Sequence, residues 1–585
     1  MRWTLLNPDS ERVQKLIAEA GVTPLVAHLL ALRGIRNGSE AREFLSPSLA
    51  HLHSPYLMRG MPEAVARISA AIANREDILI YGDYDADGTT AVVILKTAIE
   101  LCGGLADFHV PHRIKEGYGI KDDVIERAAA AGVKLVISVD TGIRAFQAAE
   151  TARRVGIDLI VTDHHLPEAH EGVPSAYAVL NPNQHGCDYP CKALCGAGVA
   201  LKVAQALFAN FKDAADQEKL TRSFLKIAAI ATIADAVPLV GENRAIAKLG
   251  LEGLRRPVNG GLKALLEVSG LAESQRALVA GDVGFRLGPR INSAGRMDVA
   301  RDVVELFTSK DAERCRAIAA RLDLLNRERQ NEEARILTEI DTQLTDSPEW
   351  KSKYCLVLDG DGWHRGVVGI VASRVVEKTG RPALVIAKDG EEAHGSGRSI
   401  AALHLLEALE SCHDLFTRFG GHEHAVGFSL PSARLDELKH RLNSFAEQRL
   451  SQDDLIPEVT VDAEIRLASV TPKLRDSLCQ LEPFGQGNPE PVFSARGVSV
   501  VLPPQPIKEK HIKLRVKQLG NGAGSGFSYD AMGWRMASRL QSETYQIGDQ
   551  LDIAFRITVN EHPEFGGLEL TLVDFKKSLA AASSV

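Results

Sequence analysis

The sequence predicts an α/β protein with a mainly parallel sheet, a long connecting helix, a second and smaller α/β domain, and an all-β domain near its C-terminal end. Three patterns support this prediction. Short apolar runs alternate with Ala-rich helical stretches over residues 62–250, which is typical of parallel sheets. Apolar residues recur at a helical spacing over 309–344. Residues 458–575 are rich in β-branched residues, Gly and Pro, which favour strands and turns.

The elements can be placed in order along the chain. A helical pattern covers 11–50, and apolar runs that indicate strands cover 78–80, 135–137 and 159–161. Two further strands are expected at 355–358 and 383–386, with a helix after Gly366 between them. We therefore expect five segments, which are an N-terminal helical segment (1–60), a large catalytic α/β domain (61–260), a helical connector (261–345), a smaller substrate-binding α/β domain (346–456) and an all-β nucleic-acid-binding domain (457–578).

Composition excludes several classes of protein. Hydrophobic residues make up 45% and charged residues 25%, which is ordinary for a globular protein, and no apolar run reaches the ~18 residues of a membrane span. Eight cysteines in 585 residues do not suggest a disulfide framework, so we expect a cytoplasmic protein. His185, Cys187, Cys191 and Cys195 lack the paired spacing of a zinc site, and we interpret the cysteines as structural thiols.

Acidic and histidine side chains follow three of the predicted strands. Ligands of parallel sheets bind beyond the carboxyl ends of the strands, so these side chains are expected in one crevice. A fourth acid lies in the apolar segment 231–238, where a lone carboxylate would be costly to bury. The residues are Asp83, Asp85 and Asp87 after the first strand, Asp140 after the second, Asp163, His164 and His165 after the third, and Asp235.

Clustered carboxylates repel one another unless cations neutralise them. An oxygen-rich set with an imidazole suits Mg²⁺ or Mn²⁺ better than Zn²⁺. Two such ions ~3.5–4 Å apart can activate a water and stabilise the leaving oxygen of a phosphodiester. Asp140, on the middle motif, is our candidate for the bridging ligand. A single Asp at a strand end is most often a helix cap, but the joint occurrence of these motifs is harder to explain in that way.

These motifs resemble those of the DHH phosphoesterase superfamily, in the order that the superfamily has them. Within it, the chain is most similar to the RecJ branch, and the resemblance spans about residues 1–575. The segments that carry it are Asp83–Gly88, Val139–Gly142, Asp163–His165, Ala234–Leu239, His394–Ser399 and Gly420–His422 for the superfamily and its accessory DHHA1 domain, and Glu116–Gly119, Arg286–Met297, Gly362–Gly369 and Pro483–Asn488 for RecJ.

The resemblance implies a role for each acidic residue. Asp85 and Asp140 would hold one divalent metal ion, either Mn²⁺ or Mg²⁺. The other ion would be held by Asp87, Asp140, His164 and Asp235. The remaining residues, Asp83, Asp163 and His165, would have catalytic roles, the first two by supporting the ligands and the third near the scissile phosphate. Related pyrophosphatases have a ligating His where this chain has Tyr81, so one metal position is expected to be more open.

The resemblance also implies the substrate, because RecJ enzymes degrade single-stranded DNA from the 5′ end. Partners implied in the same way are single-strand-binding protein and a helicase, in recombination and repair; we expect a monomer and no membrane contact. A net charge of −8 argues only weakly against a nucleic-acid partner, because metal-holding carboxylates enter this sum. Candidate DNA contacts are Arg113, Arg290, Ser396, Arg398, Gly420, Gly421 and His422, because glycine backbone and arginine side chains bind phosphates.

A strictly alternating strand is expected over 511–517. Its apolar residues would face a core, while Lys513, Arg515 and Lys517 would line the other face. We interpret it as part of an oligonucleotide-binding (OB) barrel that contacts DNA; the alternative is a solvated edge strand.

Two other functions remain open from the sequence. The first is a DHH enzyme acting on oligoribonucleotides or cyclic dinucleotides, although those enzymes generally lack the C-terminal β domain. The second is a non-catalytic DNA-binding scaffold, which would require the loss of metal ligands that are all present here.

Overall fold

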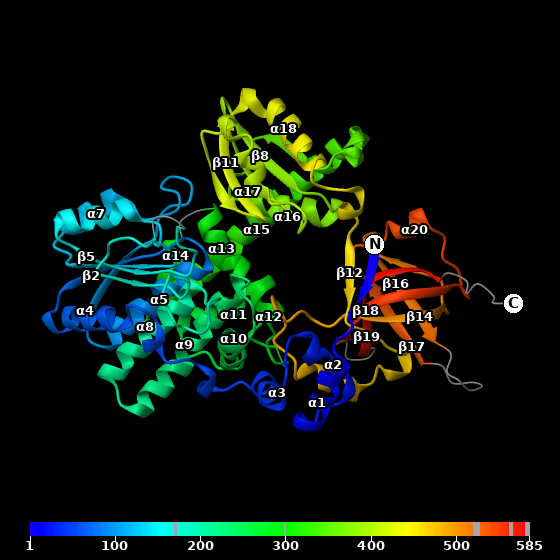
Figure 1. Ribbon diagram of the computed structural model, residues 1–585, viewed down its shortest axis with the longest axis horizontal. Coiled ribbons are helices and arrows are strands. Elements are labelled where there is room, and N and C mark those ends of the chain that lie inside the picture. The colour runs from blue at the N-terminus through cyan, green and yellow to red at the C-terminus, as the bar shows by residue number, and fades with distance from the viewer. Residues whose placement is uncertain (169–171, 275, 298–299, 519–526, 561–565, 579–585) are drawn as a thin grey trace. The chain divides into compact units, whose positions relative to one another are not determined.

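The structure is a computed structural model that describes residues 1–168, 172–274, 276–297, 300–518, 527–560 and 566–578. The chain divides into two compact units (Figure 1). One unit is the continuous segment Leu49–Leu455, and the other combines Met1–Ser48 with Ile456–Val585. The predicted fold class is confirmed, because the structure has a parallel sheet, a long helix, a smaller mixed sheet and a C-terminal β barrel.

A five-stranded parallel sheet forms the first part of the larger unit. Its strand order is β3-β2-β4-β5-β6, and the three strands predicted from the apolar runs are β2, β4 and β5. Because the sheet is buried on both faces, β4 has no exposed residue. The bounds are β2 Asp77–Tyr81, β3 Leu105–His109, β4 Leu135–Val139, β5 Asp158–Thr162 and β6 Ala178–Leu180.

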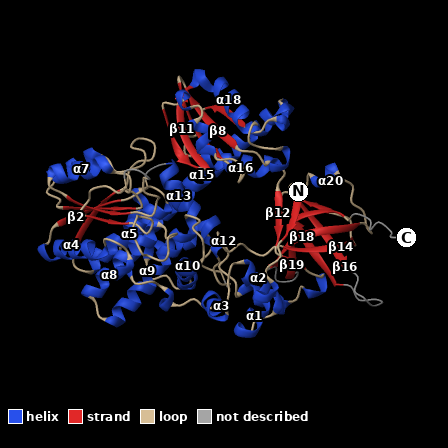
Figure 2. Cartoon of the chain, viewed as in Figure 1, coloured by secondary structure: helices blue, strands red, loops and turns tan. Residues whose placement is uncertain are grey.

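Helices cover both faces of this sheet (Figure 2). One face packs against α4, α5 and α8, and the other against α6 and α7, in two separate hydrophobic cores. The helix α9 packs against α5 and α8 and ends next to Asp235. The bounds are α4 Met61–Asn74, α5 Ala86–Leu101, α6 Asp122–Ala130, α7 Phe146–Val155, α8 Gly196–Phe211 and α9 Ala214–Ala234.

Helices connect this domain to the smaller sheet of the same unit. The predicted long helix is α15, which has 35 residues and packs against α11 and α13. A single π-helical turn, Val283–Leu287, precedes α13. The bounds are α10 Gly241–Leu254, α11 Gly260–Val268, α12 Ala280–Asp282, α13 Gly288–Met297, α14 Arg301–Thr308 and α15 Ala312–Asp346.

The smaller sheet has five strands in the order β10-β11-β9-β8-β7. Only the pair of β7 and β8 is parallel, and α16 (Val368–Thr379) connects these two strands. Helices α17 (Leu405–Glu410) and α18 (Leu435–Glu447) contribute to the core of this domain. The strands are β7 Leu356–Asp361, β8 Ala383–Asp389, β9 Glu392–Arg398, β10 Arg418–His422 and β11 Ala425–Pro431.

The other unit is a β barrel with helices packed on it. Strand β14 pairs with both β18 and β16, which closes the ring β14-β18-β19-β17-β16. Helices α1 (Ser10–Ala20), α2 (Pro24–Leu32) and α3 (Gly38–Leu45) share one hydrophobic core with this barrel. The ring strands are β14 Phe493–Val500, β16 His511–Gln518, β17 Phe527–Gly533, β18 Gln550–Asn560 and β19 Gly567–Lys577.

The chain's first strand joins this unit as well. Strand β1 (Arg2–Leu5) pairs in parallel with β12 (Glu458–Val461). The indole Nε1 of Trp3 donates a hydrogen bond of 2.8 Å to Asp574 in the barrel. Residues from the two ends of the sequence therefore build a single folded unit.

Candidate metal centre and substrate site

The carboxyl edge of the parallel sheet brings the predicted acidic residues together. Ligand atoms lie within 4.8 Å of one another in three overlapping groups. Asp140 belongs to two of the groups and His164 to two, so the groups form one continuous centre. They are Asp83–Asp85–Asp140, Asp87–His164–Asp235 and Asp140–His164–His165.

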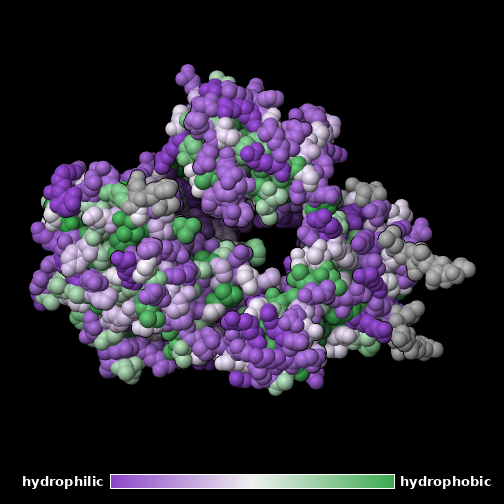
Figure 3. Space-filling view, viewed as in Figure 1, coloured by the Kyte–Doolittle hydropathy of each residue, from purple (hydrophilic) through white to green (hydrophobic). Residues whose placement is uncertain are grey.

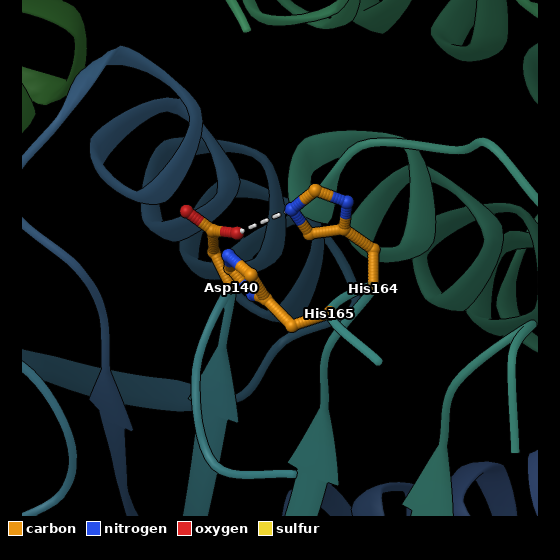
Figure 4. A group of neighbouring side chains, drawn as sticks. All are labelled: Asp140, His164 and His165. Carbon is orange, nitrogen blue, oxygen red and sulfur yellow. Dashed lines mark ion pairs between the residues drawn. The ribbon is translucent and has the colours of Figure 1, made fainter. Parts of the chain in front are cut away.

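Asp140 occupies the middle of this centre. Figure 4 shows its carboxylate turned toward His164, and Oδ1 lies 3.2 Å from His164 Nε2. Its backbone is left-handed, with φ 58°, which is costly for a residue other than glycine. Ala236, directly after Asp235, has a φ of 56°. Left-handed backbone at one acid, Asp140, and directly after another, Asp235, indicates that the fold holds these side chains in a set position.

Two of the buried carboxylates each have an oxygen atom that accepts no hydrogen bond from the protein. Within the described residues, Asp83 Oδ1 and Asp140 Oδ1 are buried and receive no hydrogen bond. Burial, together with the charges of neighbouring carboxylates, raises the pKa of Asp83, Asp85 and Asp140, and it raises the pKa of Asp235 to about 9. Such oxygens fit divalent cations, and the oxygen-rich donor set with an imidazole suits Mn²⁺ or Mg²⁺.

The N-terminus of α8 holds Asp87. The backbone N–H groups of Gly196 and Ala197 donate hydrogen bonds of 2.6 and 2.7 Å to its two carboxylate oxygens. Gly196 also lies against Asp140, because a Cβ placed on it would be 2.5 Å from Asp140 Cβ. The helix end therefore positions two acids at once, and it requires a glycine at this position. The sequence contains no local signal for this role.

Asp163 and His165 form a separate hydrogen-bonded pair beside the centre. Asp163 accepts bonds from the backbone N–H of Ile143 and His164, and its Oδ1 lies 2.8 Å from His165 Nδ1. Burial alone would lower the pKa of His165, but the hydrogen bond and charge of Asp163 outweigh it and raise this pKa to about 9. The contact with Asp163 thus favours the protonated form of the His165 ring.

Helix α13 contacts the acidic loop, residues 83–87, which carries Asp83, Asp85 and Asp87. Asn292 Oδ1 accepts a hydrogen bond of 2.8 Å from the backbone N–H of Ala86, the residue between Asp85 and Asp87. A Cβ on Gly295 would lie 2.2 Å from the carbonyl oxygen of Tyr84. The family resemblance pointed to Arg286–Met297 but identified only Arg290 in it as a contact. The structure adds Asn292 and Gly295, whose contacts fit a role in positioning this loop.

Replacement of Asn292 by alanine is expected to weaken Mn²⁺ binding roughly tenfold, as the loss of a group that orients metal ligands does. Calorimetric titration with Mn²⁺ measures this affinity. The matched control is Asn259→Ala, because Asn259 also bonds a helix N-terminus, through Leu262 N at 2.9 Å, but lies outside the centre. An Asn292→Ala affinity equal to that of the control would contradict the positioning role.

Three arginines gather next to the acidic centre. The pKa of Arg296 is lowered to about 10 by burial and by the neighbouring charges of Arg113, Arg329 and Arg398, of which Arg329 is paired with Glu333. The guanidinium of Arg113 lies 4.9 Å from the ring centre of Tyr84, in the acidic loop. Mutual repulsion among these groups would be relieved by a bound anion. Arg113 and Arg398 were expected from the sequence, whereas Arg296 was missed because no local pattern distinguishes it.

The register of the smaller sheet aligns the other predicted contacts. Ser396, Gly427 and Gly420 lie side by side across β9, β11 and β10. Arg398 and His422 flank Ala425 in a second row. The pKa of His422 is lowered mainly by burial, and the charge of Arg398 contributes to the same shift. Gly421 has a φ of 143°, and a Cβ there would lie 2.2 Å from Ala425 O.

The predicted contact Arg290 is paired within the protein. Its Nε donates a hydrogen bond of 2.9 Å to Asp323 on α15, and its Nη1 donates to the carbonyl of Arg286 at 2.6 Å. This side chain joins α13 to α15 and is not in the arginine cluster. Tyr81 is fully buried and donates its hydroxyl to Gly119 O, so it supplies no metal ligand.

The alternating strand lies in the barrel, as β16. Ile512, Leu514 and Val516 are fully buried, which confirms the expected apolar face. On the other face, Lys513 and Arg515 both pair with Asp530 on β17, at 3.0 and 2.7 Å. This part of the predicted basic face is therefore partly neutralised within the barrel. Lys517 lies opposite Ser528 in the register of the same two strands.

Two other features were tested by the structure. Among the described residues, Cys187, Cys191 and Cys195 belong to none of the candidate metal groups, and all three cysteines are free thiols. None of the described helices is long and apolar enough to cross a membrane. The face of the molecule in Figure 3 is covered mainly by hydrophilic side chains, with scattered apolar ones.

Comparison with known proteins gives matches along the whole chain. Three family models match: the DHH family N-terminal domain at 77–232, the DHHA1 domain at 352–448 and the RecJ OB domain at 461–574. The single-stranded-DNA-specific exonuclease RecJ of Dickeya dadantii is 38% identical over 92% of this chain and 93% of its own length. RecJ of Bacillus subtilis is 37% identical over 96% of this chain and 69% of its own length.

A solved structure is also similar over nearly the whole chain. The crystal structure of RecJ from Thermus thermophilus in complex with Mn²⁺ has a TM-score of 0.83 and 29% identity, covering 99% of this chain and 80% of that one. The same Thermus protein in complex with Mg²⁺ gives a TM-score of 0.77.

Proposed function

The chain belongs to the RecJ family of single-stranded-DNA-specific exonucleases, and from this premise we propose that it removes nucleotides from the 5′ end of single-stranded DNA with two divalent cations. The observation that carries the proposal is the centre of clustered carboxylates, in which Asp83 Oδ1 and Asp140 Oδ1 are buried without a hydrogen bond, next to a cluster of three arginines. Carboxylates of this kind hold the cations, and the arginines hold a terminal phosphate one nucleotide away from the bond to be cut.

The proposed ligands follow from the geometry. Asp85 and Asp140, with Asp83 in the same group, would hold one cation. Asp87, His164 and Asp235, with Asp140 between the two groups, would hold the other. Bound divalent cations would lower the pKa of the attacking water and neutralise charge on the phosphate. Relatives whose structures contain Mn²⁺ or Mg²⁺ support this class of ion.

The remaining residues of the site are proposed to orient the metal ligands and to contact the phosphate of the substrate. Asp163 fixes His165 through Nδ1, which leaves the Nε2–H of the protonated ring as a hydrogen-bond donor to a phosphate oxygen. The N-terminus of α8 fixes Asp87, and Asn292 fixes the backbone beside Asp85. These contacts hold the ligands before substrate binds, so little reorganisation is required during the reaction.

The arginine cluster is the proposed 5′-phosphate site. Arg398 Nη1 donates to Ser396 Oγ at 3.1 Å, which orients the guanidinium, and Arg113 and Arg296 approach from the larger domain. Because a guanidinium binds a phosphate through charge-assisted hydrogen bonds, the cluster favours a phosphorylated end over a hydroxyl end. Gly420 and Gly421 would let the backbone approach the same group.

Arg398→Ala is expected to raise the KM for a 5′-phosphorylated oligonucleotide by about tenfold or more, because a hydrogen bond to a charged group contributes about 1.5–3 kcal/mol. The KM for the 5′-hydroxyl oligonucleotide should change much less. Steady-state kinetics on both substrates measure the ratio. Arg381→Ala is the control, because Arg381 bonds carbonyls of Lys351 and Lys353 on the same domain. An unchanged preference for the phosphate in Arg398→Ala would argue against this site.

The proposed activity itself is tested with end-labelled substrates. A single strand labelled at its 5′ end should release a labelled mononucleotide at once in Mn²⁺, whereas a 3′-labelled strand should shorten progressively. Blunt duplex DNA, an oligoribonucleotide and a cyclic dinucleotide serve as comparison substrates. Immediate mononucleotide release from the 3′ label would reverse the proposed polarity, and preferential hydrolysis of either RNA-type substrate would reassign the enzyme within its superfamily.

The barrel is proposed to bind single-stranded DNA through β16. Joint replacement of Lys513, Arg515 and Lys517 by alanine should reduce the dependence of log affinity on log salt by up to ~0.7 per lost phosphate contact. Because Lys513 and Arg515 share Asp530, we expect a total change smaller than three full contacts. Anisotropy titrations of a long oligonucleotide across a salt series measure the slope.

The control for this experiment has the same change in charge. It replaces three exposed basic residues of the same unit that lie outside the barrel strands, which are Lys15, Arg36 and Lys473. Equal salt dependence of affinity for the wild type and the β16 variant would favour the alternative interpretation, in which this strand is a solvated edge that does not contact DNA.

A further inference from the structure

One cavity of the larger unit is lined by residues that neighbour Arg113 and Arg296 in the sequence. Its volume is about 730 Å³. One wall is the face of α15 that carries Asn331 and Arg335, and another is the loop around His364, between β7 and α16. Ile114 and Met297 complete the lining, and they directly follow Arg113 and Arg296 in the sequence. The cavity thus borders the proposed phosphate site through two pairs of adjacent residues.

The basic side chains of the cavity are already paired within the protein. Arg335 lies 2.7 Å from Glu339, Arg365 lies 3.1 Å from Asp389, and Lys388 lies 3.0 Å from Asp361. Glu328 adds a further acid to the lining. Because these cations are occupied, the cavity does not attract a second phosphate as the arginine cluster does.

The other lining groups are neutral and suit a flat, polar ring. His364 Nδ1 accepts a hydrogen bond of 3.1 Å from Gly366 N, and burial lowers its pKa, so the ring is neutral and Nε2 carries the hydrogen. The Asn331 amide offers both donors and an acceptor. Ile114, which is 44% exposed, and the half-buried Met297 provide apolar contact surface. This combination of apolar contact and adaptable hydrogen bonding is typical of sites for single-stranded bases.

We propose that this cavity receives the nucleobase of the 5′-terminal nucleotide while the arginine cluster holds its phosphate. The inference rests on the proposed function and extends it, because it assigns a site to the terminal base. An amide that can donate and accept fits each of the four bases, so the cavity does not select a sequence. It distinguishes a terminal nucleotide that has a base from one that has lost it.

The test compares two 5′-phosphorylated oligonucleotides that differ only in the first residue, which is either a normal nucleotide or a stable abasic analogue. For the wild type, the KM for release of that residue should be roughly fivefold or more higher with the abasic end, the lower limit for a base contact. The kcat should change little, because binding that is equal in ground and transition states affects KM alone. An abasic residue ten positions from the end is the substrate control.

A variant with both Ile114→Ala and Asn331→Ala should lose this discrimination and bind both ends as weakly as the wild type binds the abasic end. Both residues are exposed, so the fold should tolerate the change. Gln330→Ala is the matched control, because Gln330 is the exposed neighbour of Asn331 on α15 but does not line the cavity.

The outcomes separate the two proposals. Digestion of both oligonucleotides with equal KM in the wild type overturns the base site and leaves the exonuclease assignment intact. Retained discrimination in the double variant also overturns the site. Failure of the wild type to digest either single strand in Mn²⁺ overturns the proposed function, and this inference with it.

Discussion

Asp140→Ala is expected to reduce hydrolysis of single-stranded DNA by roughly three orders of magnitude or more. Asp140 belongs to the group proposed for one cation, and its Oδ1 lies 3.2 Å from His164 Nε2, a proposed ligand of the other, so its loss should disturb both positions together. Removing a group on which a whole catalytic unit depends has effects of this size. The rate of mononucleotide release in Mn²⁺ under single-turnover conditions measures the effect.

The same variant has a second readout that does not depend on activity. Wild-type protein should gain thermal stability when Mn²⁺ is added, because a ligand that binds only the folded state stabilises it. Asp140→Ala should largely lose this gain, although its stability without metal should not fall, since a buried and repelled carboxylate has been removed. Asp77→Ala, at the exposed start of β2, is the control. Turnover of more than a few per cent of wild type would show that Asp140 does not bridge the two positions.

Gly196→Ala is expected to reduce activity roughly a hundredfold, the upper range for loss of a group that positions metal ligands. The added Cβ would lie 2.6 Å from Asp140 Oδ1, so either the carboxylate or the start of α8 must shift. A shift of α8 would also weaken the hydrogen bond of 2.6 Å from Gly196 N to Asp87. Calorimetric titration should show weaker Mn²⁺ binding as well.

The control separates this effect from the general cost of replacing a glycine at a helix start. Gly260 is likewise the first residue of a helix, α11, and a Cβ there would meet only Cys315 Sγ, at 3.7 Å. Gly260→Ala should therefore leave activity and Mn²⁺ affinity near wild type. If both alanine variants behave alike, the close approach of Gly196 to Asp140 has no functional importance.

The parts of the fold that the sequence predicts are those encoded by local patterns. The apolar runs at 78–80, 135–137 and 159–161 became β2, β4 and β5 because each run is long enough to fill one buried strand. The acids that follow these strands came together because parallel strands share one carboxyl edge. The strict alternation of apolar and basic residues over 511–517 predicted β16, because successive side chains of a strand point to opposite faces.

The parts that the sequence did not predict depend on distant residues. Asn292 reaches Ala86 across 206 positions, and Gly196 reaches Asp87 across 109, so neither contact leaves a local pattern. The partner of Arg290 is Asp323 on another helix, which only the packing of α13 on α15 reveals. Asp530 pairs with Lys513 and Arg515 through the register of β16 and β17, and no property of the 511–517 segment indicates this acid.

The shared core of α1–α3 and the barrel has a consequence for how the protein is made. Leu29 and Leu30 of α2 are fully buried in a core that they share with Phe493 and Phe555 of the barrel. During synthesis these leucines leave the ribosome long before Phe493 and Phe555. The apolar surface of α1–α3 therefore stays exposed until the barrel has been synthesised. Residues 49–455 can complete their own cores in the meantime, because domains fold as units during translation. If translation stops before the barrel is complete, we expect the released chain to have residues 49–455 folded and residues 1–48 unfolded and prone to aggregate.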